Sequence, residues 1–229
     1  MKRSEINIIM REAVKFIEEQ KFYLPKFAYW TGVDWENKGE EIREIINNQL
    51  GWDITDFGRG NFSKFGLILF TIRNGNLKDI EKGGKAYCEK VMIADEGQIT
   101  PMHYHFQKAE DIINRGGGDL LVQLYNPTKD NKLADTNVIV SIDGTKINVE
   151  AGVILTLTPG ESITLPSYLY HKFWVKEGMG KVLIGEVSGV NDDRVDNQFL
   201  EKIGRFPAIE EDEEPLYLLY NDYKNINNI

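Results

Sequence analysis

The chain has 229 residues, 41% hydrophobic and 28% charged, which is typical of a globular protein and excludes a disordered one. Its net charge of −9 argues against a nucleic-acid surface, which needs clustered Lys and Arg. No apolar run approaches the roughly 20 residues that span a bilayer, and the first residues lack the apolar region of a signal peptide. Cys88 is the single cysteine, so we expect a buried thiol, no intrachain disulfide and a cytoplasmic location.

Residues 1–50 are expected to form a helical extension. Apolar residues recur at helical spacing over residues 4–21, with Ser4 as the N-cap, and a second short helix is expected within residues 40–50. The irregular segment 22–39 between them is rich in aromatic residues. These rings either pack in the ordinary way or cover one mouth of a cavity.

Residues 51–229 are expected to form a β-barrel that packs with the extension as a single structural domain. Short β-branched and aromatic runs alternate there with polar turns, which is typical of an antiparallel sandwich or barrel. Asp143-Gly144 indicates a two-residue hairpin. The acidic run 210–214 is expected to be solvated, and residues 216–223 are apolar enough to dock on the body. The predicted strands lie within residues 66–72, 87–93, 120–125, 138–142, 153–157, 162–165 and 181–187.

Two of the three histidines lie two residues apart, and on a strand such residues face the same side. These are His103 and His105, and Tyr104 between them then faces the other way. A hairpin at residues 107–109 would carry Glu110 onto the neighbouring strand, pointing at the same place. His171 would join them from a distant strand.

Three imidazoles and a carboxylate suit Mn²⁺, Fe²⁺, Co²⁺, Ni²⁺ or Zn²⁺ better than Ca²⁺ or Mg²⁺. In an octahedral field they leave two positions for adjacent substrate oxygens. The spacing resembles the first motif of the cupin superfamily, Gly97-x5-His103-x-His105-x4-Glu110-x6-Gly117. Gly160-x5-Pro166 with His171 resembles most of the second motif, although Tyr168 stands where that motif has Gly and Val175 where it has Asn.

Further segments resemble the D-lyxose isomerase family of cupins; they are residues 24–30, 50–59, 69–75, 110–118 and 185–193. The resemblance implies a Mn²⁺-dependent aldose–ketose isomerase that interconverts D-lyxose and D-xylulose, and usually D-mannose and D-fructose. It also implies an all-β, jelly-roll-like cupin barrel with N-terminal helical additions. The chain is expected to form a homodimer and to bind a monosaccharide as its substrate. The metal ligands carry over to His103, His105, Glu110 and His171.

Isomerisation also needs a base beside C1 and C2 that moves a proton between them through a metal-stabilised cis-enediolate. Glu186 is the candidate, because it shares a strand face with apolar residues, and burial there would raise its pKa toward neutrality. Alternatively, Glu186 orients a ligand imidazole. Lys108 could donate to substrate oxygens or shuttle the second proton, or be a solvated turn residue. Lys90 and Asp193 are candidates for binding hydroxyl groups.

Three other functions stay open. An Fe(II)-dependent cupin oxygenase would use the open metal positions for O₂, and a sugar-binding cupin would bind without turnover. A phosphosugar isomerase would need phosphate contacts from Lys90, Lys108 and Arg115, although Arg115 lies in a glycine run and is expected to be structural.

Overall fold

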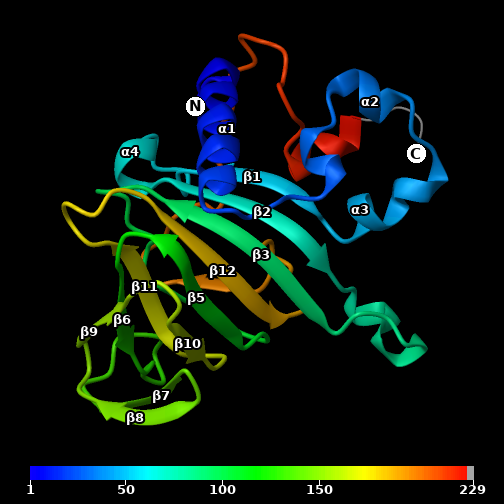
Figure 1. The fold of residues 1–229 in the computed structure, drawn as a ribbon. Helices are drawn as coiled ribbons and strands as arrows, with labels where there is room; N and C mark the ends of the chain where they lie inside the picture. Colours follow the sequence, from blue (N-terminus) through cyan, green and yellow to red (C-terminus); the bar gives the residue numbers. More distant parts are fainter. Residues whose placement is uncertain (226–229) are drawn as a thin grey trace.

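The computed structural model describes residues 1–225, and two antiparallel β-sheets that face one another make up most of it (Figure 1). The larger sheet has the order β1-β2-β3-β12-β5-β10-β7-β8, and the smaller has the order β13-β4-β11-β6-β9. The strands of the larger sheet are β1 (Gly51–Thr55), β2 (Leu67–Asn74), β3 (Tyr87–Ala94), β12 (Val182–Gly189), β5 (Glu110–Gly117), β10 (Ser162–Leu165), β7 (Val138–Ile142) and β8 (Thr145–Val149). Those of the smaller sheet are β13 (Asn197–Phe199), β4 (His103–His105), β11 (Tyr170–Val175), β6 (Leu120–Tyr125) and β9 (Ile154–Leu157).

This arrangement confirms the predicted antiparallel jelly-roll-like barrel. Each predicted strand coincides with an observed one to within two residues at either end. The hairpin between β7 and β8 is also confirmed, with Asp143 at φ 48° and Gly144 at φ 78°. A type I′ turn requires positive φ at both central residues, which explains the Asp-Gly sequence.

The predicted N-terminal helix is α1 (Arg3–Glu19), but Ser4 is not its N-cap. The N-cap is Lys2, two residues earlier, and both the backbone N–H and the hydroxyl of Ser4 donate to the carboxylate of Asp212. Glu211 likewise accepts from the buried guanidinium of Arg3. The acidic run is therefore not simply solvated, because its carboxylates satisfy donors at the positive end of α1.

The other helices are short: η1 (Lys26–Tyr29), α2 (Gly32–Glu36), η2 (Glu40–Ile42), α3 (Arg43–Asn47), α4 (Phe62–Phe65), η3 (Leu77–Lys82) and η4 (Tyr220–Asn225). The helix expected within residues 40–50 is thus divided between η2 and α3. η3 projects from the body beyond the ends of β2 and β3 (Figure 1). Within the part of the chain that the structure describes, no helix is long and apolar enough to cross a membrane.

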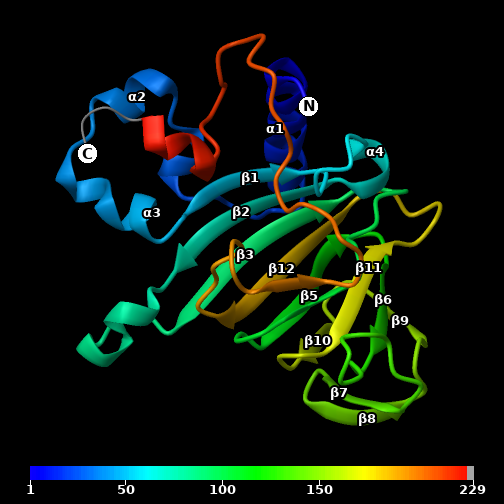
Figure 2. The ribbon, with the colours of Figure 1, turned by 180° about the vertical axis from the view of Figure 1, so that it is seen from behind.

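The aromatic segment 22–39 packs on the outside of the larger sheet and does not cover the cavity near the histidines. Phe27 lies 5.2 Å from Phe70 of β2, and Trp35 lies 4.6 Å from Tyr223 of η4, both between ring centroids. The contact between Trp35 and Tyr223 and the burial of Leu219 confirm the expected docking of residues 216–223. Figure 2 shows the C-terminal segment returning past α1 to the helices α2 and α3.

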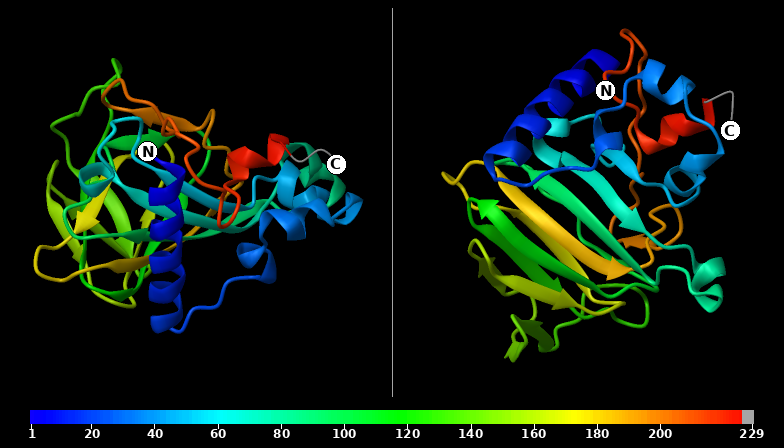
Figure 3. Two further views of the ribbon diagram at one scale, coloured as in Figure 1. Left: turned by 90° about the horizontal axis from the view of Figure 1, so that it is seen from above. Right: turned by 45° about the vertical axis from the view of Figure 1, so that its right-hand side comes forward.

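The larger sheet separates two apolar cores, because its strands alternate between its two faces. Leu69 and Met92 face the smaller sheet, whereas Phe70 and Ile93 face the opposite way and pack with α1. Figure 3 shows α1 on the face of the larger sheet that points away from the smaller one. Burial of each such side chain contributes roughly 1.5–3 kcal/mol, so α1 is an integral part of the fold.

Candidate metal and sugar site

The three histidines converge between the sheets at the middle of the barrel. His103 and His105 lie on β4, and β4 pairs with β11 so that His171 stands opposite His103. One ring nitrogen from each imidazole lies within 4.8 Å of the others, and all three side chains are buried. As predicted, Tyr104 points to the other side, where it packs edge-on against Tyr170 at 4.8 Å between ring centroids.

Glu110 reaches the same place, but the predicted hairpin is wrong. Residues 107–109 cross from β4 in the smaller sheet to β5 in the larger one, so that Glu110 faces the histidines from across the barrel. Its Oε2 lies 3.3 Å from Nε2 of His105, and its Oε1 lies 3.1 Å from Nε2 of His171. The hairpin prediction failed because the chain changes sheet at this turn.

The hydrogen bonds of the imidazoles fit a metal ion. Nδ1 of His103 lies 2.8 Å from the carbonyl of Pro101, and Nδ1 of His171 lies 3.0 Å from that of Leu169. A proton assigned to Nδ1 by these contacts leaves Nε2 with a free electron pair. Nε2 of His171 is buried and has no hydrogen-bond partner among the described residues, although a carboxylate oxygen lies beside it. Nε2 of His171 and Oε1 of Glu110 are both electron-rich, and a cation bound by both atoms would stabilise this arrangement.

The charges of the four groups also fit. Burial lowers the pKa of His103 well below its ordinary value, and burial followed by the charge of Lys108 lowers the pKa of His105. Burial is the largest single influence on the pKa of Glu110 and would raise it, but Lys108, 2.9 Å away, and His105 together outweigh burial and keep that pKa well below the ordinary value. Neutral imidazoles and an ionised carboxylate are the forms that bind metal.

The remaining predicted residues form what we call the charged row: Glu110, Lys108, Glu186, Lys90 and Asp193, with alternating charges. Nζ of Lys108 lies 2.5 Å from Oε1 of Glu186, and Nζ of Lys90 lies 3.4 Å from the same oxygen. Nζ of Lys90 also lies 3.6 Å from Oδ2 of Asp193. Lys108 is 3% exposed, so it is not a solvated turn residue.

Glu186 is buried on β12 as predicted, but its predicted pKa shift has the wrong sign. Burial acts to raise the pKa, whereas the ammonium groups of Lys108 and Lys90 together outweigh burial and lower it below the ordinary value. The interior around Glu186 is therefore charged and not apolar. Its oxygen accepts hydrogen bonds from Lys108 and Ser188 and from no imidazole in the described part of the chain.

Two further charged residues extend the charged row and were not predicted from the sequence. Nη2 of Arg205 lies 2.6 Å from Oδ2 of Asp53 and 3.2 Å from Oδ2 of Asp193. Asp53 stands between Trp52 and Ile54 on the buried strand β1, and a charge inside such a run was a usable signal. Arg205 lies in an irregular segment after β13, where the sequence carries no comparable signal.

A small cavity lies over these groups, and the centre of a water molecule can move within about 40 Å³ of it. Phe199 of β13 closes one side, 5.6 Å from His103 between ring centroids. The cavity has room for only a few waters. Arg115 is exposed and does not line this cavity.

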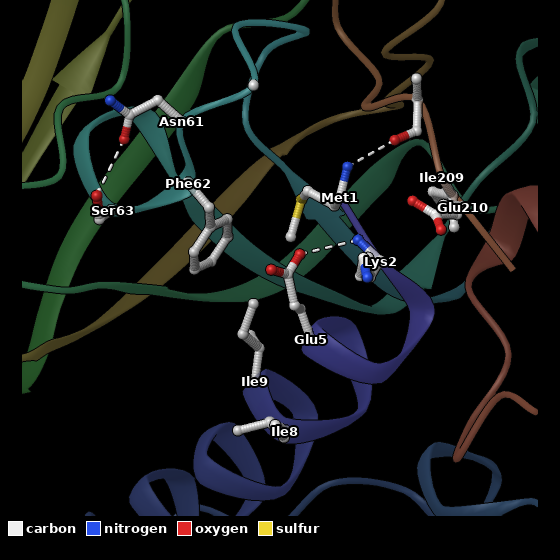
Figure 4. Close-up of a pocket in the computed structure, with 12 residues that line it drawn as sticks. Met1, Lys2, Glu5, Ile8, Ile9, Asn61, Phe62, Ser63, Ile209 and Glu210 are labelled. Carbon is white, nitrogen blue, oxygen red and sulfur yellow. Dashed lines mark hydrogen bonds between the residues drawn. The ribbon is translucent and has the colours of Figure 1, made fainter. Parts of the chain in front are cut away.

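A larger hollow of about 840 Å³ opens at the amino end of α1 (Figure 4). Its carboxylate Glu5 already accepts from the backbone of Lys2, and Asn61 accepts from Ser63 (Figure 4). The side chains there form no group with metal-ligand or catalytic geometry among the described residues. The chemistry of the molecule lies in the smaller cavity.

One of the two departures from the second cupin motif, at Tyr168, has a local structural answer. Tyr168, which stands where the motif has Gly, itself adopts φ 61°. Its backbone N–H donates to the carbonyl of His105 at 2.8 Å, and its ring lies 5.4 Å from that of Tyr104. These contacts hold a left-handed conformation that a non-glycine residue rarely adopts, so the loop before His171 keeps its geometry.

The sequence and the fold agree with known sugar isomerases. Residues 1–223 match the model of a family described as D-lyxose isomerase. The chain belongs to the D-lyxose isomerase family. A relative named D-lyxose/D-mannose isomerase from Escherichia coli O157:H7 is 46% identical over 225 residues, which cover 98% of this chain and 99% of that protein. One with the same name from Serratia proteamaculans is 46% identical over 228 residues, with 97% and 98% covered.

Solved L-ribose isomerases share the fold of this family member. The enzyme from Cellulomonas parahominis with L-ribose has a TM-score of 0.56 at 15% identity, covering 92% of this chain and 98% of that one. The enzyme from Acinetobacter sp. DL28 in complex with L-ribose has a TM-score of 0.56 at 14% identity, with 91% and 98% covered. The predicted cupin barrel is thereby confirmed, and family membership makes this chain a sugar isomerase of the aldose–ketose class.

Proposed function

We propose that this chain is a divalent-metal-dependent isomerase that converts D-lyxose to D-xylulose and D-mannose to D-fructose. The observation that carries the proposal is the buried contact between Lys108 and Glu186, 2.5 Å apart, directly beside Glu110 and the three imidazoles. The names of the relatives supply the substrates.

His103, His105, Glu110 and His171 would hold the metal ion. When bound, the ion would act as a Lewis acid that polarises the substrate carbonyl. We infer Mn²⁺ as the natural ion. A set of nitrogen and carboxylate donors is also compatible with Co²⁺, Fe²⁺, Zn²⁺ or Ni²⁺.

Glu186 is the base in this proposal. It takes the proton from C2 of the open-chain aldose. The electron pair left behind forms the C1–C2 double bond while the carbonyl pair moves onto O1, which gives an enediolate. Glu186 then returns a proton to C1 as the double bond to O2 forms. Its lowered pKa keeps the carboxylate ionised at neutral pH and available for the first step. The cost is a weaker base, which the polarised carbonyl offsets by making the C2 proton more acidic.

Lys108 is a hydrogen-bond donor to the oxygens on C1 and C2. It lies between the carboxylates of Glu110 and Glu186, which hold its proton. A positive charge there stabilises the negative charge that develops on the oxygens. The oxygen proton then passes from O2 to O1 within the sugar while Lys108 keeps its own. Lys90 and Asp193, further along the charged row, would bind the next hydroxyl groups.

The geometry disfavours the three other functions. Buried charges on one wall of the cavity suit a polyol better than the apolar substrate of many oxygenases. A phosphosugar site is disfavoured because Lys90 and Lys108 already pair with carboxylates and Arg115 lies outside the cavity. A sugar-binding protein without activity would have no use for the close contact between Lys108 and Glu186.

The proposal is tested with metal-stripped protein reloaded separately with Mn²⁺, Co²⁺, Fe²⁺, Zn²⁺ and Ni²⁺. We expect conversion of D-lyxose to D-xylulose in D₂O to place deuterium on C1 of the product. Complete retention of the original hydrogen would indicate a hydride shift and remove Glu186 as the base. Failure of all five reloaded forms to convert either sugar would refute the isomerase assignment, and an absolute need for O₂ would favour the oxygenase.

The homodimer stays a prediction from the resemblance, and the cytoplasmic location stays a prediction from the single cysteine. Sedimentation equilibrium of the purified chain, which should give twice the 26.3 kDa monomer mass, tests the first.

A further inference from the structure

A second, smaller cavity adjoins the site at the end of the charged row. The centre of a water molecule can move within about 10 Å³ of it. Leu69 and Asp193 line both cavities. Asp53, Thr71 and Tyr220 line the smaller one alone. A space of this size accepts one water-sized group, so the smaller cavity extends the site by about one hydroxyl.

Two donors at this end of the site lack acceptors. The hydroxyl of Tyr220 is buried and has no hydrogen-bond partner among the described residues. The same holds for Nη1 of Arg205, whose Nη2 already pairs with Asp53 and Asp193. Buried polar groups in proteins are nearly always hydrogen-bonded, so unmet donors from two separate segments indicate a place for a polar ligand atom.

The position of this cavity fits one end of the substrate. The row of charges leads from Glu110, beside the histidines, through Lys90 and Asp193 to Arg205. If C1 and C2 react at Glu186, the far end of the sugar points toward Arg205. D-lyxose and D-mannose have the same configuration from C2 to C4, and the hexose is longer by one hydroxyl-bearing carbon.

We propose that the smaller cavity is the subsite for the terminal hydroxyl, O6, of a hexose. Within the smaller cavity, Tyr220 donates a hydrogen bond to O6 and Asp53 accepts one from it, while Arg205 lines the larger cavity next to it. This inference rests on the proposed isomerase function and deepens it, because it makes Thr71 and Tyr220 determinants of the choice between hexose and pentose.

Thr71→Leu tests the proposal by filling the smaller cavity from β2, where Thr71 is buried on the inner face. We expect the ratio of kcat/KM for D-mannose to that for D-lyxose to fall at least about 10-fold, the scale on which one missing or extra group is discriminated. Thr71→Ser, the matched control, leaves the cavity open and should leave this ratio within about 2-fold of the original. A ratio that Thr71→Leu leaves unchanged, or equal losses for both sugars, overturns the proposal.

Tyr220→Phe keeps the packing and removes one donor, so it covers the case in which Thr71→Leu fails to fold. It should lower the same ratio by about 3- to 10-fold, mainly through a higher KM for D-mannose, and an unchanged ratio counts against the proposal.

Inhibition by the hexitol and pentitol obtained by reducing the two sugars gives a readout without turnover. Thr71→Leu should weaken binding of the hexitol more than that of the pentitol, and equal weakening contradicts the subsite. If the wild-type protein converts neither sugar, the isomerase proposal has failed. If it converts both and the ratio does not respond, the subsite alone has failed.

Discussion

The two faces of the larger sheet differ sharply although neighbouring residues of the same strands build them. On β1, β3 and β12 the inner face carries Asp53, Lys90 and Glu186, and the outer face carries apolar residues such as Trp52 that pack with the helical extension. Buried ion pairs add little net stability, because desolvation offsets their attraction. The outer core and the apolar part of the inner core stabilise the strands, so the part of the inner face at the site can carry charge.

The largest expected effect is on the inner face. His171→Ala removes one imidazole, and activity should fall by more than about 100-fold, since even partners that only orient metal ligands are worth 10- to 100-fold. Metal content measured by elemental analysis should fall in parallel, and added Mn²⁺ should no longer raise the melting temperature. Full activity and unchanged metal content in this variant would remove His171 from the site.

Glu186→Gln separates chemistry from metal binding on the same face. We expect kcat to fall by about 10²- to 10⁴-fold, the usual contribution of a general base, while the metal content stays that of the wild type. A drop in metal content instead would mean that Glu186 acts by positioning Glu110 through Lys108. Deuterium exchange from D₂O into unreacted D-lyxose should be lost together with kcat.

On the outer face, Trp52→Ala should cost stability and little activity per folded molecule. The side chain is 1% exposed, and its Nε1 donates to the carbonyl of Ala28 at 2.8 Å. Its loss should lower the free energy of unfolding by about 3–5 kcal/mol, as measured by urea denaturation. Val187→Ala, at a half-exposed position of the same face, is the control and should change the free energy by no more than about 0.5 kcal/mol. A large loss of kcat in folded Trp52→Ala would show that the two faces are not separable.

The smallest effect concerns the start of α1. The hydrogen bond from Arg3 lowers the pKa of Glu211, so its contribution is present above the ordinary carboxyl pKa and lost as the pH falls through the lower folded value. Glu211→Gln should therefore lower stability by up to about 1 kcal/mol at pH 7, because the carboxylate is exposed and screened. Thermal melts should show this difference shrinking below about pH 4.3. If the difference in stability between the wild type and Glu211→Gln persists at pH 3, the effect comes from packing and not from charge.

The sequence was sufficient for what local spacing determines. Histidines two apart must share a strand face, and the Asp143-Gly144 pair has few alternatives to a tight hairpin. This spacing pairs His103 with His105, and the resemblance to the cupin motifs adds Glu110 and His171, so the four proposed ligands could be named before their positions were known. The change of sheet between His105 and Glu110 could not be predicted, because a hairpin turn and a crossover between sheets have similar sequences over three residues.

Tertiary contacts decide the rest. The pKa of Glu186 depends on Lys108 and Lys90, which reach it from two other segments, so burial alone predicted the wrong sign. Arg205 is placed by Asp53, some 150 positions earlier in the chain, and no periodicity links the two. Ser4 missed its expected role because Asp212, near the other end of the chain, supplies the oxygen for its N–H.

The meeting of the two ends of the chain has a consequence for biosynthesis. The carboxylates that bind the first turns of α1, and the arginine that completes the charged row, are translated after every strand of both sheets. A nascent chain halted before residue 205 would expose part of the outer core and lack one wall of the cavity. The last contacts of the fold and of the site can therefore form only when these final residues have been synthesised. A product truncated before residue 205 should lose both solubility and activity.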